Sequence, residues 1–197
     1  MTDIPDSAGA GPARGPVRIR LAHTAELTPG ELAAARTLLD DAFADSPGEE
    51  FTDEDWDHSR GGMHVLAWEG AALIGHAAVV QRRLLHGGRA LRTGYVEGVA
   101  VRADRRGRGV GAALMTAAER VVHGGYELGA LGSAEDATGF YTARGWRPWQ
   151  GPLSALTPDG VVPTPEEAGW IHVLAVAGTP LDPTGPLTCD WRDGEVW

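Results

Sequence analysis

The sequence predicts a single α/β domain, and three observations support this prediction. The chain has 197 residues, which is long enough to bury one full hydrophobic core. Its content of hydrophobic residues, 43%, is ordinary for a globular protein. Segments that alternate apolar and polar residues are interleaved with segments of helical period, in the order β-α-α-β-β-β-α-β-α-β-β.

The start of the chain has a different character from the rest. Residues 1–16 show no periodicity, and we expect a disordered tail there, followed by one domain over residues 17–197. The tail has no continuous apolar stretch and no early basic region, so it is not expected to be a signal peptide. Residues 17–24 alternate as the first strand.

Two helices follow from capping signals. Thr28 and Glu31 have the spacing of a capping box, and a proline stands at the first helical position between them. The helix is expected to run to about Phe43. Thr52 and Asp55 mark the start of a second, short helix.

The middle of the chain contains the longest apolar alternations. Residues 63–85 are predicted to form two strands joined at Glu69 and Gly70, and residues 86–101 a turn and a third long strand. A helix is expected over residues 110–122, where apolar residues recur on one face.

The last third is predicted to hold shorter elements. We expect a strand at residues 126–131 and a helix within residues 133–149 that ends where another strand starts, at Gly145 and Trp146. A last strand is expected at residues 170–176, after a loop rich in proline and glycine. The sequence contains no internal repeat.

Composition limits the classes of partner. The formal net charge of −10 disfavours binding to nucleic acid or to anionic membranes, and it favours a cationic partner. Seven acidic residues lie within residues 45–57, although a solvated loop and helix start would also explain them. No apolar stretch has the length of a membrane span. We therefore expect neither nucleic acid nor membrane as a partner.

Cysteine and histidine usage points to a protein without disulfides or metal. The single cysteine, Cys189, excludes an intramolecular disulfide and makes a cytoplasmic location the default expectation. The seven histidines lack the spacing of metal ligands, so no metal site is predicted.

The stretch "VEGVAVRADRRGRGVGAAL", residues 96–114, concentrates four arginines and four glycines in an otherwise acidic chain. It lies where a predicted strand passes into a predicted helix. The first N–H groups of a helix lack partners, the helix dipole is positive there, and glycines let a ligand approach the backbone. The turn is therefore suited to binding a phosphate.

Two nucleotide-binding motifs explain this turn poorly. A Walker loop requires a lysine, and the sequence contains none. Gly107, Gly109 and Ala112 satisfy a dinucleotide fingerprint, but its acidic residue would have to be Glu127. Glu127 falls at the start of the next strand, whereas ribose recognition needs an acid at a strand's carboxyl end.

A third motif, R-x-x-G-x-G, is met by Arg106, Gly109 and Gly111, and it resembles the pyrophosphate-binding turn of the GNAT superfamily of N-acetyltransferases. The later segment "SAEDATGFYTARGWRPW", residues 133–149, also resembles that superfamily. The order of elements is that of the GNAT fold, a mixed sheet with helices on both faces.

A closer resemblance extends from about Val17 to the last residue. The chain is similar to the aminoglycoside 2′-N-acetyltransferases in the stretches "FTDEDWDHSRGGMHVLAWEG", "HAAVVQRRL", "LRTGYVEGVAVRADRRGRGVGAAL", "YELGALGS", "YTARGWRPWQGP" and "CDWRDGEVW". This resemblance implies direct transfer of an acetyl group from acetyl-CoA to the 2′-amine of an aminoglycoside, a bulky polycation, within a ternary complex. It also suggests a homodimer.

The resemblance implies roles for individual residues. Glu97 would remove the proton of the amine through water, and Tyr141 would protonate the departing thiolate. Gly98 suits a β-bulge that opens a slot for the pantetheine arm. The cofactor would be bound by Val99, Ala100, Val101, Arg106, Gly107, Arg108, Gly109, Val110 and Gly111, and the substrate by Glu50, Asp55, Glu97, Gly98, Ser133, Glu195 and Trp197, whose terminal carboxylate is itself a candidate.

Several alternatives stay open at this stage. Cys189 could carry the acetyl group covalently, but no neighbouring base is evident, and a buried apolar role is expected. Gly132 stands where a serine is expected in relatives, so a hydroxyl contact to the sugar is lost or shifted to Ser133. The runner-up functions are acetylation of another amine, such as a cell-wall precursor or polyamine, and binding of acyl-CoA or drug without turnover. Glu97 and Tyr141 argue against the last.

Overall fold

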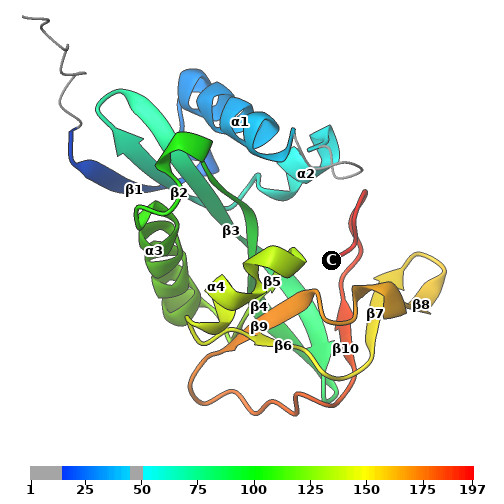
Figure 1. Cartoon of the computed structure of the whole chain (residues 1–197). Helices are drawn as coiled ribbons and strands as arrows, with labels where there is room; N and C mark the ends of the chain where they lie inside the picture. The colour runs from blue at the N-terminus through cyan, green and yellow to red at the C-terminus, as the bar shows by residue number, and fades with distance from the viewer. Residues whose placement is uncertain (1–14, 45–50) are drawn as a thin grey trace, which may run out of the picture.

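A ten-stranded mixed sheet is the centre of the structure, a computed structural model that describes residues 15–44 and 51–197 (Figure 1). The main path of the sheet is β6-β9-β5-β4-β3-β10-β7-β8, and β2 joins β1 to β3. The strands are β1 (Val17–His23), β2 (Met63–Glu69), β3 (Ala72–His86), β4 (Arg89–Val101), β5 (Leu128–Gly132), β6 (Arg147–Pro148), β7 (Leu153–Thr157), β8 (Gly160–Pro163), β9 (Ile171–Ala175) and β10 (Leu187–Cys189).

Four α-helices connect these strands in the described part of the chain: α1 (Pro29–Phe43), α2 (Asp53–His58), α3 (Val110–Gly125) and α4 (Thr138–Thr142). The capping box predicted for α1 is confirmed, because Thr28 accepts from the N–H of Glu31 while Glu31 accepts from the N–H of Thr28. The helix also ends at Phe43, as expected. None of the described helices is both long and apolar enough to cross a membrane.

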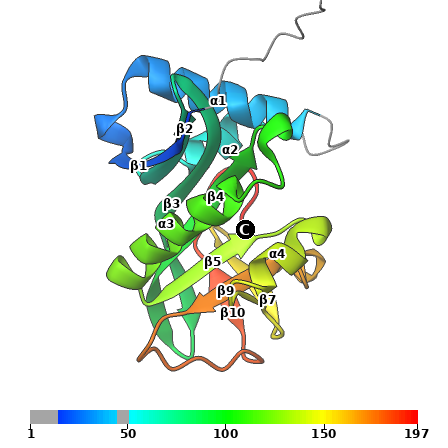
Figure 2. The ribbon, with the colours of Figure 1, turned by 60° about the vertical axis from the view of Figure 1, so that its left-hand side comes forward.

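Helices cover both faces of the sheet, which confirms the predicted fold class. Strand side chains alternate between the faces. On β2, Val65 lies in one core cluster with Leu114 of α3, whereas Leu66 lies in another with Leu38 of α1. Figure 2 shows α1 and α3 as separate layers.

A third core cluster lies under the C-terminal third of the chain. Its members include Tyr95 of β4, Trp149, Leu187 of β10 and the last residue, Trp197. The C-terminal segment is therefore docked on the sheet. In Figure 1 it runs from β10 (red) past α2.

Strand β4 has two irregularities. Its pairing with β3 shifts register between His76 and Ala78, where a bulge places Gly98 at φ 55°, a conformation that favours glycine. The bulge expected at Gly98 is thereby confirmed. The parallel pairing of β4 with β5 is confined to residues 93–95 of β4. Beyond these residues, the last part of β4 has no β5 partner.

The predicted Pro/Gly-rich loop after residue 149 is more ordered than expected. It contains the antiparallel hairpin of β7 and β8, and β10 then pairs parallel to β7 and antiparallel to β3. The sequence signals for these strands were weak because the strands have three to five residues, with glycine or proline at or directly beside their ends. The predicted order of elements was therefore right as far as β6 and incomplete after it.

Candidate active site

The turn between β4 and α3 has an open helix N-terminus. Gly107 and Gly109 have φ of 70° and 81°, and Gly109 is the N-cap residue of α3. Among the described residues, no side chain caps this end of α3. The first N–H groups of the helix are consequently available to an anion.

The four arginines of this turn have different partners. Arg105 is ion-paired with Glu69 at 2.6 Å and with Asp104, and Arg102 is ion-paired with Asp104 at 2.7 Å. Arg106 donates from Nε to the carbonyl of Val101. The structure gives Arg108 no hydrogen bond or ion pair among the residues it describes. Arg108 is therefore the cation most available to a phosphate.

The predicted pantetheine residues lie on the part of β4 that has left β5. Val99 and Val101 pack against the α3 side of the core, and Ala100 is buried. Ala100 and Val101 pair with β3, Val99 lies in the bulge, and none of the three pairs with β5. A strand with one unpaired edge can bind an extended ligand through backbone hydrogen bonds. Val110 is buried under the first turn of α3, and an added Cβ on Gly111 would lie 3.7 Å from the ring of Phe140.

Tyr141 lies on α4, next to this turn. The ring of Phe140 on α4 would lie 3.7 Å from a Cβ added at Gly111 in the first turn of α3, and α4 follows the carboxyl end of β5. Tyr141 is 6% exposed, and burial raises the pKa of its hydroxyl to about 12. At neutral pH it therefore carries a proton that it can donate.

A partly buried network holds the segment directly after α4 against α3. Glu119 of α3 accepts hydrogen bonds from Arg144 at 2.6 and 2.7 Å and from the indole of Trp146 at 3.0 Å. Tyr141 makes an edge contact with Trp146. These contacts limit movement of Tyr141 relative to α3.

Glu97 lies immediately before the bulge and is ion-paired with Arg192 of the C-terminal segment. The two side chains are 15% and 14% exposed. Arg192 also donates to the terminal carbonyl oxygen of Trp197 at 2.5 Å. One guanidinium thus joins the proposed base to the last residue of the chain.

The C-terminal segment is held by a second arginine. Arg82 of β3 is ion-paired with Asp190 at 2.8 Å and donates to the carbonyl of Val196 at 2.7 Å. The indole of Trp197 is buried and donates to Thr164 at 2.8 Å. Arg82 and Arg192, to which the sequence analysis assigns no role, therefore partly neutralise the acidic groups of the C-terminal segment.

The predicted acidic substrate residues lie on α2 and in the C-terminal segment, and one lies outside the described residues. Asp55 is on α2, where one carboxylate oxygen caps the helix by accepting from Thr52 at 2.8 Å. The α2 helix contacts the C-terminal segment, since His58 bonds the carbonyl of Asp193 at 2.7 Å. Glu195 is exposed, and its carbonyl accepts from Arg192. Glu50 lies outside the described residues.

Ser133 faces away from the surface. It is 4% exposed, and its hydroxyl donates to the carbonyl of Ala134 at 3.0 Å. The exposed neighbour is Gly132, where an added Cβ would lie 3.9 Å from the hydroxyl of Tyr95. Ser133 therefore does not supply the hydroxyl that a serine at position 132 would present.

Cys189 is unsuited to covalent catalysis. Its side chain is fully buried, and burial raises the pKa of the thiol to about 11. The apolar role predicted for it is confirmed. Within residues 15–44 and 51–197, no group of histidine, cysteine and acidic side chains is arranged to hold a metal ion.

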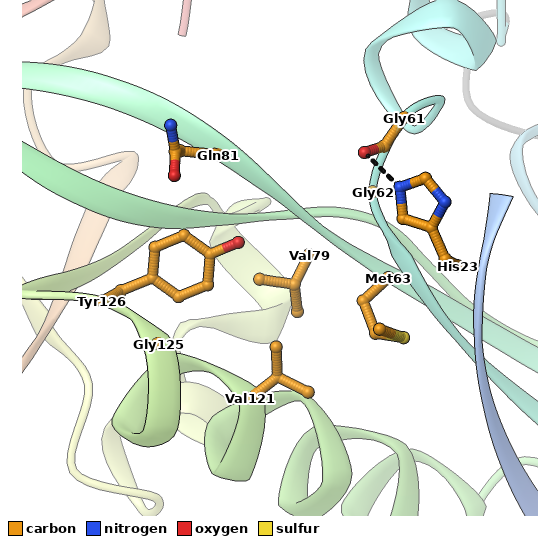
Figure 3. A pocket seen from close by; sticks show the side chains of 9 residues that line it. All are labelled: His23, Gly61, Gly62, Met63, Val79, Gln81, Val121, Gly125 and Tyr126. Atoms are coloured by element: carbon orange, nitrogen blue, oxygen red, sulfur yellow. Dashed lines mark hydrogen bonds between the residues drawn. The ribbon is translucent and has the colours of Figure 1, made fainter. Parts of the chain in front are cut away.

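A separate hollow lies on the α3 face of the sheet, opposite to the face on which the side chain of Glu97 lies (Figure 3). It has a volume of about 360 Å³ and is lined by residues that include His23, Val79, Val121 and Tyr126. Val79 pairs with Val96 on the α3 side, so Glu97, the next residue, faces the other side. The hollow is not continuous with the site around Glu97.

Comparisons with known proteins agree with this geometry. The model of the acetyltransferase (GNAT) domain matches residues 23–149. The aminoglycoside 2′-N-acetyltransferase of Mycolicibacterium fortuitum is 50% identical over 193 residues, which cover 95% of this chain and 97% of that protein.

Solved structures support the fold alone. A GNAT family N-acetyltransferase of Escherichia coli in complex with CoA has a TM-score of 0.60 at 18% identity, covering 92% of this chain and 93% of that one. A GNAT family acetyltransferase of Brucella melitensis in complex with acetyl-CoA has a TM-score of 0.58 at 19% identity, covering 86% and 94%.

Proposed function

Because the chain belongs to the aminoglycoside 2′-N-acetyltransferases of the GNAT superfamily, we propose that it acetylates the 2′-amine of aminoglycosides by direct attack on acetyl-CoA in a ternary complex. The observation that supports the site most strongly is the position of Glu97. This carboxylate lies at the bulge of β4, just beyond the point where β4 and β5 cease to pair. Such acetylation confers aminoglycoside resistance.

Acetyl-CoA would bind across the open turn and along β4. Arg108 and the first N–H groups of α3 would hold the pyrophosphate, with Arg106 and the glycines of the turn. The pantetheine arm would lie against the unpaired edge of β4 at Val99, Ala100 and Val101. Nothing in this chemistry requires a metal ion, since a backbone N–H can polarise the thioester carbonyl.

Two proton transfers are needed. An alkylammonium cannot attack a thioester, so Glu97 would accept its proton, directly or through water. The amine nitrogen then bonds to the acetyl carbon, and the tetrahedral intermediate expels the CoA thiolate. Tyr141, kept protonated by its raised pKa, would donate a proton to that thiolate.

Charge would attract the second substrate. The aminoglycoside carries several ammonium groups, and the chain has a net charge of −10. The cationic substrate would be bound by Asp55 on α2, by Glu195 and the terminal carboxylate of Trp197, and by the backbone at Gly98. Glu50, outside the described residues, stays a predicted contact.

Thiol release from acetyl-CoA tests this proposal when two aminoglycosides are compared that differ only in an amine or a hydroxyl at the 2′ position. Turnover is expected with the amine alone. Equal rates with both would place acetylation elsewhere and refute the proposed regiochemistry. Glu97→Gln and Tyr141→Phe should each lower kcat by about tenfold to a thousandfold if they transfer protons.

Two further features stay predictions of the family resemblance. We infer a homodimer, which light scattering of the purified protein would test. We also infer a cytoplasmic location, which is compatible with a single, reduced cysteine in the sequence.

A further inference from the structure

Two buried histidines lie behind the bulge of β4. His64 of β2 and His76 of β3 are both 0% exposed, and their rings are in contact, with Nδ1 of His64 lying 2.9 Å from Nε2 of His76. Nδ1 of His76 lies 2.8 Å from the carbonyl oxygen of Gly98. At the other end, Nε2 of His64 lies 2.9 Å from the hydroxyl of Thr24.

The donor and acceptor in each of these hydrogen bonds follow from the last acceptor of the series, the carbonyl oxygen of Gly98. A carbonyl oxygen only accepts, so Nδ1 of His76 must carry the proton that it donates to Gly98. Burial lowers the pKa of each histidine to about 4, so both rings are neutral near pH 7. A neutral ring has one donor, so Nε2 of His76 accepts from Nδ1 of His64, and Nε2 of His64 accepts from the hydroxyl of Thr24 at 2.9 Å. The single proton of that hydroxyl is then not donated to the carbonyl of Gly62, which lies 3.2 Å away. The chain of donors runs from Thr24 to Gly98.

The carbonyl of Gly98 needs this donor because the bulge interrupts the ladder between β3 and β4. His76 pairs with Ala100 and Ala78 pairs with Glu97, so two residues of β4 oppose one of β3. A buried carbonyl without a partner is unfavourable. The side chain of His76 satisfies the carbonyl that this arrangement displaces.

Fixing that carbonyl also fixes the groups on either side of it. The peptide group between Gly98 and Val99 is planar, so its carbonyl and the N–H of Val99 turn together. Gly98 directly follows Glu97, and its φ of 55° sets the direction in which the chain leaves that residue. The hydrogen bond from His76 therefore limits rotation at the bulge that carries the proposed base.

The same pair supports the helix that bears Asp55. The ring of Trp56 on α2 lies 6.3 Å from the ring of each histidine. Ser59, which follows α2, is fully buried, and its hydroxyl would lie 3.3 Å from a Cβ added at Gly98. The histidine pair thus lies between α2 and the bulge.

We infer that His76, oriented by His64, is a positioning residue that holds the bulge at Gly98 in the geometry needed for acetyl transfer. This inference rests on the proposed role of Glu97. His76 does not touch the reacting atoms, and it acts through the peptide group of Gly98 and Val99, to whose carbonyl it donates.

Steady-state kinetics of His76→Leu test the inference. This substitution removes the donor, and kcat for the aminoglycoside should fall roughly 10- to 100-fold, because small displacements of reacting groups are costly. The KM for acetyl-CoA should change little. His76→Asn places an amide N–H near the position of Nδ1 and should recover part of kcat.

His86→Leu is the matched control. His86 lies at the other end of β3, is 8% exposed, and bonds the carbonyl of Pro186 through Nδ1 at 2.9 Å. Its replacement should lower the thermal midpoint without lowering kcat. If His76→Leu lowers the thermal midpoint equally and leaves kcat at the wild-type value, the contact serves stability alone and the inference is wrong.

A spectroscopic measurement on the unaltered enzyme gives an independent test, and it holds even if His76→Leu fails to fold. Imidazole ¹⁵N spectra at pH 7 should show His64 and His76 as neutral rings protonated on Nδ1. A His76 ring protonated on Nε2 would have no proton for Gly98 and would overturn the inference. The activity of Glu97→Gln separates the inference about His76 from the proposed role of Glu97. Full activity in that variant would refute Glu97 as the base.

Discussion

Arg192 is ion-paired with Glu97, although 95 residues of sequence separate them. The same guanidinium donates to the carbonyl of Glu195 and to the terminal carbonyl oxygen of Trp197. The C-terminal segment is therefore attached to the strand that bears the proposed base. The positive charge of Arg192 balances the negative charge of Glu97.

Arg192→Ala should raise the KM for the aminoglycoside by about tenfold or more. It leaves two carboxyl groups without their shared cation and releases the end of the chain, and each charge-assisted hydrogen bond contributes roughly 1.5–3 kcal/mol. The KM for acetyl-CoA should not change. Arg89→Ala is the control, since it removes the same charge from an exposed pair with Glu127. Equal drug KM values in the two variants would show that the pair with Glu97 has no part in substrate binding.

Arg108→Ala should weaken acetyl-CoA binding by about tenfold, because the variant loses one charge-assisted contact to the pyrophosphate. Calorimetric titration of the enzyme with acetyl-CoA would measure the change. Arg102→Ala, in the same turn, removes a cation that is already paired with Asp104 and should have a much smaller effect. A larger loss in Arg102→Ala would mean that the phosphate lies elsewhere on the turn.

Stability should depend on pH through His64 and His76. In the folded chain burial lowers the pKa of both rings to about 4, from the ordinary histidine value of 6.5. Between pH 6.5 and 4 the unfolded chain binds protons that the folded chain does not, so the free energy of unfolding falls as pH falls. The slope should reach up to about 1.4 kcal/mol per pH unit for each histidine.

Urea unfolding at pH 7, 6 and 5 would measure this dependence above the range where carboxylates titrate. His76→Asn removes one of the two histidines and should reduce the slope by about half. A free energy of unfolding that stays constant from pH 7 to 5 would contradict the assignment of neutral, buried rings.

Gly132→Ser should stabilise the protein. The hydroxyl of Tyr95 is buried and has no hydrogen-bond partner among the described residues, and burial raises its pKa so that it keeps its proton. A serine at position 132 would bring an acceptor toward it, worth about 0.5–1.5 kcal/mol, or a few degrees in thermal midpoint. Gly132→Ala is the control, and equal midpoints for alanine and serine would show that no bond forms.

Local signals made much of the fold predictable. The helix at residues 29–43 was predicted with its cap because a capping box involves residues three apart. The Arg/Gly turn was found because helix N-termini and glycines have a local sequence pattern. The hairpin at residues 153–163 was missed because its strands are short and their burial depends on distant partners.

The side-chain contacts within the site could not be predicted from the sequence, because they join residues that are far apart along the chain. Arg192 stands among acidic residues, and the sequence alone does not reveal that it pairs with Glu97. The sequence shows that His64 and His76 lack the spacing of metal ligands. Their contact with each other depends on the register of β2 against β3, which local patterns do not reveal. The resemblance assigns Ser133 to the substrate, whereas its burial, 4% exposed, follows from the fold and has no local sequence signal.

The position of the acetyl group in the product tests the central claim most directly. NMR spectra of the aminoglycoside isolated after complete turnover with acetyl-CoA should show one acetyl group, on the 2′ nitrogen. An acetyl group on any other amine, or on a hydroxyl, would contradict the proposed function.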